Sequence, residues 1–381
     1  MDFSYTEEQL ALQDTLQRFI AREYDFETRR KLVSSGIGFS KAAWKQYADL
    51  GLLSVPFPED YGGLGGNSID IMLIMEMIGR GLLLEPYCTS VVLCGCLIRD
   101  AAPEAMRKAI LPAIGEGKLQ LAFACYEAAG RYDLAYVGAK ALSDGRGGWR
   151  LTGRKSVVSD GPSADRFLVS ARVSGNVNDR DGISLFLVDR NAAGITLSGY
   201  PTQCGRRAAD VNFDNVAVGA DALIGSAGNA LDIIERAVDR GIAALCAEAV
   251  GIMVALNEAT LNHLKTRKQF GVPIGKFQAL QHRMADMFIA TEQARSMAII
   301  AAVNADSDDA PARRRAISGA KTYIGQSARL VSQQAVQLHG GMGLVDELIV
   351  SHYFKRLTMI NISLGDADYH MARFSSALEA C

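Results

Sequence analysis

The stretch IERAVDRGIAALCAEAVGIMVAL, residues 234–256, decides the fold of this chain. Its apolar residues recur every three or four positions, which is the period of one face of an α-helix, and the pattern continues to Thr266. A helix of that length, ~50 Å at 1.5 Å per residue, exceeds what a small domain builds alone. Further helical patterns follow it at Phe277–Asn304, Arg313–Leu338, Val350–Ile360 and Ala367–Leu378. Residues 226–381 are therefore predicted to form a four-helix bundle.

Short β-favouring runs occupy the middle of the chain, residues 119–225. The turns between them are rich in glycine and aspartate, as in SDGRGG at 143–148 and DRDG at 179–182. The runs are Leu121–Tyr126, Trp149–Ser159, Phe167–Val173, Ile183–Val188 and Val211–Val218. This region is predicted to be an antiparallel β domain.

Residues 1–118 carry helical patterns, the first of which opens with a capping box from Thr6 to Gln9. The predicted fold class is therefore a multidomain α+β protein. Its order is an N-terminal all-helical domain (1–118), a central β domain (119–225) and a C-terminal helical bundle (226–381).

Composition excludes several classes of function. The 381 residues include 40 Lys+Arg and 42 Asp+Glu, so no surface for nucleic acid is expected. Seven cysteines without a C-x-x-C pair, and five histidines, predict reduced thiols and no metal site. Asp2, Glu7 and Glu8 stand where a signal peptide carries basic residues, and no apolar run approaches the ~20 residues that span a bilayer. We expect a cytoplasmic protein without membrane insertion.

Four segments stand apart from ordinary packing: CYEAAGRYD at 125–133, GRKSVVSDG at 153–161, RKQFG followed by FQALQ at 267–281, and QLHGGMG at 337–343. At these segments, in their order, and at YGGLG (61–65), the chain resembles the acyl-CoA dehydrogenase family of FAD flavoproteins over essentially its whole length. It looks most similar to the branch of the pimeloyl-CoA dehydrogenase small subunit, which pairs with a larger homologous subunit. The resemblance implies a helical domain, a β-barrel-like domain and a four-helix bundle, usually in a homotetramer.

The resemblance implies FAD as the cofactor. The residues it assigns to FAD are Tyr126, Ser159, Arg267, Phe270, Gln278, Gln337, Gly340 and Gly341. Ser159 matches the position that hydrogen-bonds the N5 region of the flavin, where a donor stabilises negative charge. Arg267 matches a cation at the pyrophosphate, and its guanidinium forms charge-assisted hydrogen bonds with such a group. Gln337 and the two glycines match residues that touch the FAD of a neighbouring subunit.

Each assignment has a plainer alternative. Ser159 also fits an ordinary turn serine, and Tyr126, which replaces a threonine of relatives, also fits a β-domain aromatic packed on its neighbours. Arg267 also fits a cation at a helix C-terminus, where the helix dipole favours it. Gly340 also fits a helix C-cap. Adjacent glycines exceed what capping requires, which favours the cofactor interpretation.

The chain departs from the family at the catalytic base. Relatives carry Glu-Gly-Thr, whose Glu removes the α proton, where this chain has Leu364-Gly365-Asp366. Leucine cannot accept a proton, although its backbone N–H is still a donor to the thioester carbonyl. Asp366 and Asp239 are the candidate bases, and each also fits a solvated or capping residue. Tyr132 replaces a serine that contacts acyl-CoA in relatives, so Tyr132 and Leu364 are the predicted substrate-binding residues.

Three functions remain open from sequence alone. The first is an acyl-CoA dehydrogenase that forms a trans-2-enoyl-CoA, with a medium-chain or dicarboxylic acyl group suggested by the resemblance. The second is a subunit of a heteromeric dehydrogenase whose larger homologous partner supplies the base. The third is a flavin-free acyl-CoA-binding homologue. The implied partners are acyl-CoA, an electron-transfer flavoprotein and further subunits, in a homo-oligomer or a hetero-oligomer.

Overall fold

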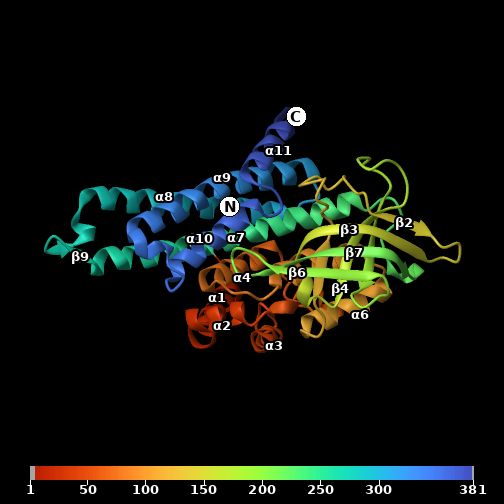
Figure 1. Cartoon of the computed structure of the whole chain (residues 1–381), viewed down its shortest axis with the longest axis horizontal. Coiled ribbons are helices and arrows are strands. Elements are labelled where there is room, and N and C mark those ends of the chain that lie inside the picture. The colour runs from red at the N-terminus through yellow and green to blue at the C-terminus, as the bar shows by residue number, and fades with distance from the viewer. Residues whose placement is uncertain (1–4, 380–381) are drawn as a thin grey trace. The chain divides into compact units, whose positions relative to one another are not determined.

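The computed structural model describes residues 5–379, and the side chains of 5–378 (Figure 1). Asp2 and one of the seven cysteines, Cys381, lie outside these residues. The chain divides into two compact units, each of which joins segments far apart in sequence. Unit 1 contains the described residues up to Arg30, Ser68–Leu83, and the described residues from Ile242 onward. Unit 2 contains Lys31–Asn67 and Leu84–Gly241.

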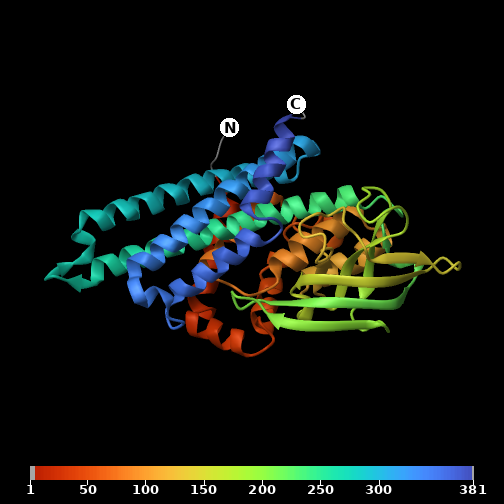
Figure 2. The ribbon, with the colours of Figure 1, turned by 45° about the horizontal axis from the view of Figure 1, so that its top comes forward.

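Unit 2 is built on an eight-stranded sheet in the order β6-β7-β3-β2-β4-β5-β8, with β1 paired to β4 (Figure 2). Its strands are β1 (Leu121–Ala124), β2 (Lys140–Ser143), β3 (Trp149–Ser159), β4 (Arg166–Arg172), β5 (Ile183–Asp189), β6 (Ile195–Pro201), β7 (Arg207–Val218) and β8 (Leu223–Ile224). The core side chains of the sheet include Phe167, Phe186 and Phe213. Most pairs are antiparallel as predicted, but β1 and β2 each pair with β4 in parallel, which the sequence analysis did not anticipate.

Helices complete unit 2. They are α3 (Lys41–Asp49), α5 (Cys96–Ala101), α6 (Glu104–Gly115) and the short turns η1 (Leu52–Ser54), η2 (Glu59–Tyr61), η4 (Gly161–Ser163) and η5 (Ala220–Ala222). A fully buried π-helix, η3 (Tyr87–Gly95), precedes α5. It packs against the sheet, where the N–H of Leu121 donates to Ser90 Oγ at 3.0 Å. This mostly apolar stretch is therefore a core helix of unit 2.

Unit 1 is helical. Its elements are α1 (Glu7–Glu23), α4 (Ser68–Gly81), the hairpin β9 (Lys268–Gln269) and β10 (Val272–Pro273), η6 (Ile274–Lys276), α8 (Gln278–Ala305), α9 (Ala310–His339), η7 (Gly340–Leu344), α10 (Ile349–Ile362) and α11 (Ala367–Glu379). Two helices, α2 (Phe26–Ser34) and α7 (Leu231–Thr266), have residues in both units. Glycines let α4 and α7 approach closely, because a Cβ at Gly79 would lie 2.1 Å from Glu248 O.

The long helix predicted from residues 234–256 is α7. By length and composition it is the one helix of residues 5–379 that passes the test for a membrane span. However, 78% of its most apolar window is buried inside the structure, as expected of a core helix. The predicted fold class is confirmed: helices, then a β sheet, then a bundle of long helices. The boundaries predicted at residues 118 and 225 stay a prediction.

Candidate functional site

Two segments assigned to the cofactor, residues 267–278 and 337–341, meet at one end of unit 1. His263 in the last turn of α7 stacks on His339 at the end of α9, with ring centroids 4.4 Å apart. One turn earlier on α9, Gln334 accepts a hydrogen bond of 2.8 Å from Arg283 of α8. We call the exposed residues gathered here the bundle-end surface: Arg267, Phe270, Gln278, Gln337, Gly340 and Gly341. The sequence predicts all six as FAD-binding residues, but it does not predict that they lie together.

A tight hairpin presents an aromatic ring on this surface. Phe270 and Gly271 form the turn between β9 and β10, with φ of 53° and 78°. Positive φ at both turn residues is the pattern of a two-residue hairpin. The Phe270 side chain is 90% exposed and contacts only the edge of Phe277 among the rings described, with centroids 6.1 Å apart. A large exposed ring held in an uncommon backbone conformation indicates a contact surface.

Gly340 and Gly341, which follow α9, differ in whether their backbone conformation requires a glycine. Gly340 is the C-cap of α9, with φ of 62°, and its N–H donates to Gln337 O. The alternative that Gly340 caps α9 is therefore correct. Gly341 has no positive φ, and a Cβ at either glycine would meet no atom within 4 Å. Packing within the chain does not require glycine at 341, whereas close approach of a ligand or another chain would.

The chemistry of the bundle-end surface fits part of a dinucleotide. Arg267 supplies a guanidinium, Phe270 a ring and the glycines an uncrowded backbone. Burial lowers the pKa of His263, and the neighbouring His339 and Arg267 lower it further. Burial also lowers the pKa of His339. The paired rings are therefore neutral near pH 7, so the positive charge of this surface comes from Arg267 and the exposed lysines beside it, Lys265 and Lys268.

In unit 2, Tyr126 and Ser159 lie on neighbouring segments of the sheet. The N–H of Ser156 on β3 donates to Tyr126 O at 2.9 Å. Ser159 ends β3 and is exposed, and the next residue, Asp160, is buried with φ of 55°. Asp160 accepts a hydrogen bond of 2.6 Å from Thr89 of η3, which fixes the strand end. A fixed strand end orients the Ser159 hydroxyl better than an ordinary mobile turn.

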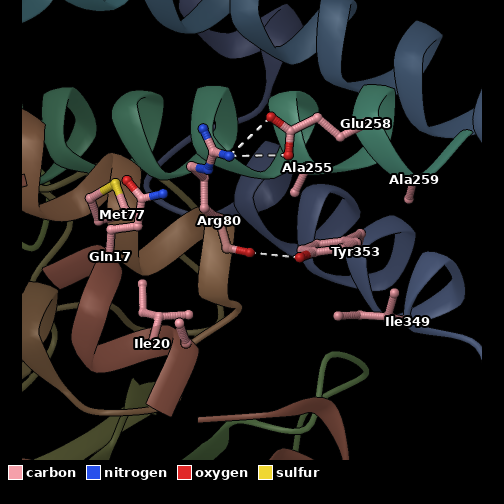
Figure 3. A pocket seen from close by; sticks show the side chains of 10 residues that line it. Gln17, Ile20, Met77, Arg80, Ala255, Glu258, Ala259, Ile349 and Tyr353 are labelled. Carbon is pink, nitrogen blue, oxygen red and sulfur yellow. Dashed lines mark hydrogen bonds and ion pairs between the residues drawn. The ribbon is translucent and has the colours of Figure 1, made fainter. Parts of the chain in front are cut away.

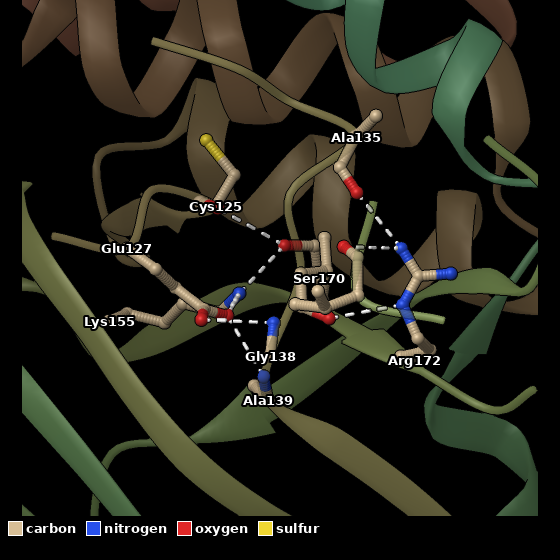
Figure 4. Close-up of polar contacts among 10 residues, drawn as sticks. Cys125, Glu127, Ala135, Gly138, Ala139, Lys155, Ser170 and Arg172 are labelled. Carbon is tan, nitrogen blue, oxygen red and sulfur yellow. Dashed lines mark hydrogen bonds and ion pairs between the residues drawn. The ribbon is translucent and has the colours of Figure 1, made fainter. Parts of the chain in front are cut away.

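A buried ion pair holds the segment that carries Tyr126 (Figure 4). Lys155 Nζ, which is fully buried, donates to Glu127 Oε1 at 2.7 Å and to Ser170 Oγ at 3.0 Å. Glu127 also accepts from the N–H groups of Gly138 and Ala139, each at 3.0 Å. Burial lowers the pKa of Lys155, and Glu127 opposes that shift. Both residues lie within the sequence motifs, but no motif predicts this pair.

Tyr132 lies in the loop that follows, in a turn closed by the Asp133 N–H donating to Gly130 O at 2.9 Å. The buried Arg172 guanidinium ties this loop down, since it donates to the carbonyls of Ala135 and Val137 at 2.9 and 3.0 Å (Figure 4). Tyr132 is half-buried. The predicted substrate residue is therefore carried by a loop with fixed backbone, separately from Leu364, which belongs to unit 1.

The segment that the sequence matches to the family base position is the turn between α10 and α11. Leu364 is half-buried with φ of 56°, and the buried Gly365 has φ of 110°. Asp366 caps α11, because its Oδ1 accepts from the Tyr369 N–H at 2.8 Å. This hydrogen bond supports the alternative that Asp366 is a capping residue.

The other candidate base, Asp239, is buried, and so is Glu248, an acidic residue further along α7. Asp239 on α7 is 1% exposed, and its neighbour Arg240 donates to Asp100 at 3.0 Å. Glu248 receives both hydrogen bonds of a bidentate pair from Arg356, at 2.6 and 2.7 Å. A buried carboxylate with such a partner is a structural ion pair.

Unit 1 also contains an open cavity of about 380 Å³ between α1, α4, α7 and α10 (Figure 3). Arg80 and Glu258 form an ion pair on its wall with contacts of 2.9 and 3.0 Å, and Tyr353 Oη donates to Arg80 O at 2.6 Å. None of the predicted site residues lines this cavity. Among residues 5–379, no cluster of three or more His, Cys, Asp or Glu side chains is arranged to hold a metal ion.

Models of three protein domains match the chain: acyl-CoA dehydrogenase N-terminal domain over residues 6–118, middle domain over 122–216 and C-terminal domain over 230–378. The probable acyl-CoA dehydrogenase YngJ of Bacillus subtilis is 28% identical over 373 residues, 97% of each protein. A variant of the Tcur3481-Tcur3483 steroid ACAD is 28% identical with a TM-score of 0.88 and 98% of both chains covered. The FAD complex of PigA is 25% identical with a TM-score of 0.92, covering 100% of this chain and 99% of that one.

Proposed function

Because this chain belongs to the acyl-CoA dehydrogenase family, and is therefore an FAD oxidoreductase acting on acyl-CoA, we propose that it needs a homologous partner for full activity. The proposal rests on Leu364, which the family resemblance matches to the catalytic base of relatives. A side chain without a proton acceptor leaves α-proton removal to another group. The proposed product is the trans-2-enoyl-CoA.

The bundle-end surface would hold one part of an FAD molecule, and Tyr126 and Ser159 would hold another part. Arg267, Phe270, Gln278, Gln337 and the two glycines would bind its dinucleotide end, and the hydroxyls of Tyr126 and Ser159 its ring. FAD, when bound, supplies the acceptor for the β hydride. Since the surface is exposed, and its glycines have open space beside them, we propose that it completes the site of a neighbouring subunit.

On the substrate, the proposed task of this chain is to hold the thioester. The Leu364 N–H would donate to the thioester carbonyl oxygen, which withdraws charge and makes the α proton more acidic. Tyr132 would contact the acyl-CoA from its loop. The α proton would pass to a carboxylate of the larger homologous subunit, because Asp366 already caps α11 and Asp239 is buried.

Further parts of the proposal rest on the family resemblance. The acyl group would be medium-chain or dicarboxylic, the electron acceptor an electron-transfer flavoprotein and the location the cytoplasm. Oligomers are typical of the family, and the steroid ACAD relative is named as a pair, Tcur3481-Tcur3483. The exposed apolar residues Ile289, Ile300 and Val303 of α8 favour association of this chain with another subunit.

An anaerobic titration tests the proposal. The purified FAD-loaded chain is mixed with octanoyl-CoA or pimeloyl-CoA, and loss of the oxidised flavin absorbance is followed with and without the larger homologous subunit. We expect slow or no bleaching of the chain alone and fast bleaching of the pair. Rapid bleaching by the chain alone would overturn the requirement for a partner.

A further inference from the structure

The turn that carries Leu364 is held by a buried histidine that no motif identified. His370 of α11 is fully buried. Its Nε2 lies 3.0 Å from Leu364 O, and its Nδ1 lies 3.4 Å from Ser318 Oγ on α9. A carbonyl oxygen only accepts, so the proton is on Nε2, and Nδ1 accepts from the Ser318 hydroxyl. Burial, followed by the nearby Lys321, lowers the pKa of His370 to about 3, which keeps the ring neutral in this tautomer.

The imidazole and the turn fit each other closely. Leu364 has φ of 56°, an uncommon conformation for a leucine, and Gly365 has φ of 110°. A Cβ at Gly365 would lie 2.4 Å from His370 Nε2. Only glycine at 365 therefore leaves room for the ring, and the ring in turn supplies the donor that holds the Leu364 carbonyl.

Two further contacts fix the ends of the turn. Lys321 Nζ, fully buried on α9, donates to Ile360 O in the last turn of α10. Asp366 caps α11 through the Tyr369 N–H. Within residues 5–379 the structure shows no hydrogen bond from the Leu364 N–H, although its neighbours are constrained. The Gly365 and Asp366 N–H groups likewise show none among residues 5–379, so the turn presents three consecutive unused donors, and the Leu364 N–H belongs to the residue whose carbonyl His370 holds.

We propose that His370 is a positioning residue: its hydrogen bond to the Leu364 carbonyl fixes the turn so that the Leu364 N–H can serve the thioester oxygen of acyl-CoA. The inference rests on the proposed function, which makes that N–H the donor. Energetically, pre-organisation matters because a donor that needs no reorganisation contributes most to polarising the carbonyl.

Two variants separate this role from packing. His370→Phe keeps a ring but removes the donor, whereas His370→Gln keeps an N–H that can reach the carbonyl. Ser376→Ala, on the exposed face of α11, is the control. Each FAD-loaded protein is mixed with octanoyl-CoA carrying carbon-13 at the thioester carbonyl, and difference infrared spectroscopy records the carbonyl stretch. Hydrogen exchange of residues 363–366 is measured on the same proteins without acyl-CoA.

We expect the wild type, the control and His370→Gln to lower the carbonyl frequency, and His370→Phe to lose most of that shift. We also expect exchange at Ser363, whose N–H is hydrogen-bonded to Met359 O and Ile360 O, to rise at least tenfold in His370→Phe only. An equal frequency shift and equal exchange in His370→Phe would overturn the role of His370 and leave the proposed function standing. A wild type without any shift would overturn the role of the Leu364 N–H, and with it this inference, even if exchange responds as expected.

Discussion

His263 and His339 stack with their ring centroids 4.4 Å apart and their planes 27° from parallel. This pair joins the ends of α7 and α9, and His339 Nδ1 is anchored to Ala335 O at 2.8 Å. Residues separated by about seventy positions in the chain thereby become one surface. The stack therefore supports the prediction that Arg267 and Gln337 contact the same ligand.

Arg267→Ala should weaken FAD binding by ~1.5–3 kcal/mol, the range for a hydrogen bond to a charged group. Because Arg267 is exposed, its loss should leave thermal stability of the FAD-free protein unchanged. Fluorescence titration of the FAD-free protein with FAD measures the affinity. Lys265→Ala, another exposed cation in the last turn of α7, is the matched control. Equal affinities for both variants would remove Arg267 from the cofactor site.

His370 makes stability depend on pH in a definite direction. Its pKa is about 3 in the folded chain against 6.5 for the free side chain, so folding favours the neutral ring. The resulting stabilisation is complete above pH 6.5 and is lost as the pH falls from 6.5 towards 3. Relative to His370→Gln, the wild type should lose about 1.4 kcal/mol more per pH unit within this window. Urea unfolding of both proteins at pH 7, 6 and 5 measures the difference, and parallel curves would contradict it.

Strong periodicity allowed much of the fold to be predicted. α7 buries most of its apolar residues, so its helical period is visible in the sequence. The strands β2 (Lys140–Ser143) and β6 (Ile195–Pro201) were missed because β2 has only four residues, the alternation of β6 is confined to Ile195–Ser198, and both strands are largely exposed. The parallel pairing of β1 with β4 depends on contacts distant in sequence, which no local pattern encodes.

The candidate site, like the fold, was predicted from the sequence only in part. Motifs such as RKQFG identified Arg267 and Phe270 through resemblance, but not the stacking that brings them to Gln337. His370 carries no motif signal, since a single histidine on an amphipathic helix usually only packs. Its relation to Leu364 depends on the left-handed turn between two helices, which appears only in three dimensions.

Exposed apolar side chains on α8 predict association. Ile289, Ile300 and Val303 are 52%, 43% and 43% exposed and recur at helical spacing. A charge placed among them should oppose burial against another subunit, so Ile300→Glu should shift the protein towards the monomer. Sedimentation velocity at micromolar concentration measures this. Leu142→Glu, at a residue of β2 that is 63% exposed, is the control and should not change the oligomeric state. A monomeric wild type that retains FAD would exclude the shared site.

The last prediction concerns the missing base. Leu364→Glu places a carboxylate at the position predicted to match the base of relatives, and the backbone already adopts φ of 56° with a non-glycine residue, so the change should not add strain. Positioned acid–base groups contribute about 10²–10⁴ in rate, so flavin bleaching by acyl-CoA should accelerate within that range. Leu364→Gln has the same length without a proton acceptor and should remain slow.

Two further variants decide whether the wild type already has a base. Asp366→Asn keeps the cap of α11, because asparagine caps helices as well as aspartate does, and removes only the proton acceptor. Asp239→Asn removes the proton acceptor of Asp239, which lies within α7. Fast bleaching by the wild-type chain alone that either variant abolishes would identify that aspartate as the base. Fast bleaching that neither variant affects, together with no gain from Leu364→Glu, would mean that the proton leaves through a residue outside the α10–α11 turn, and that Leu364 does not occupy the base position.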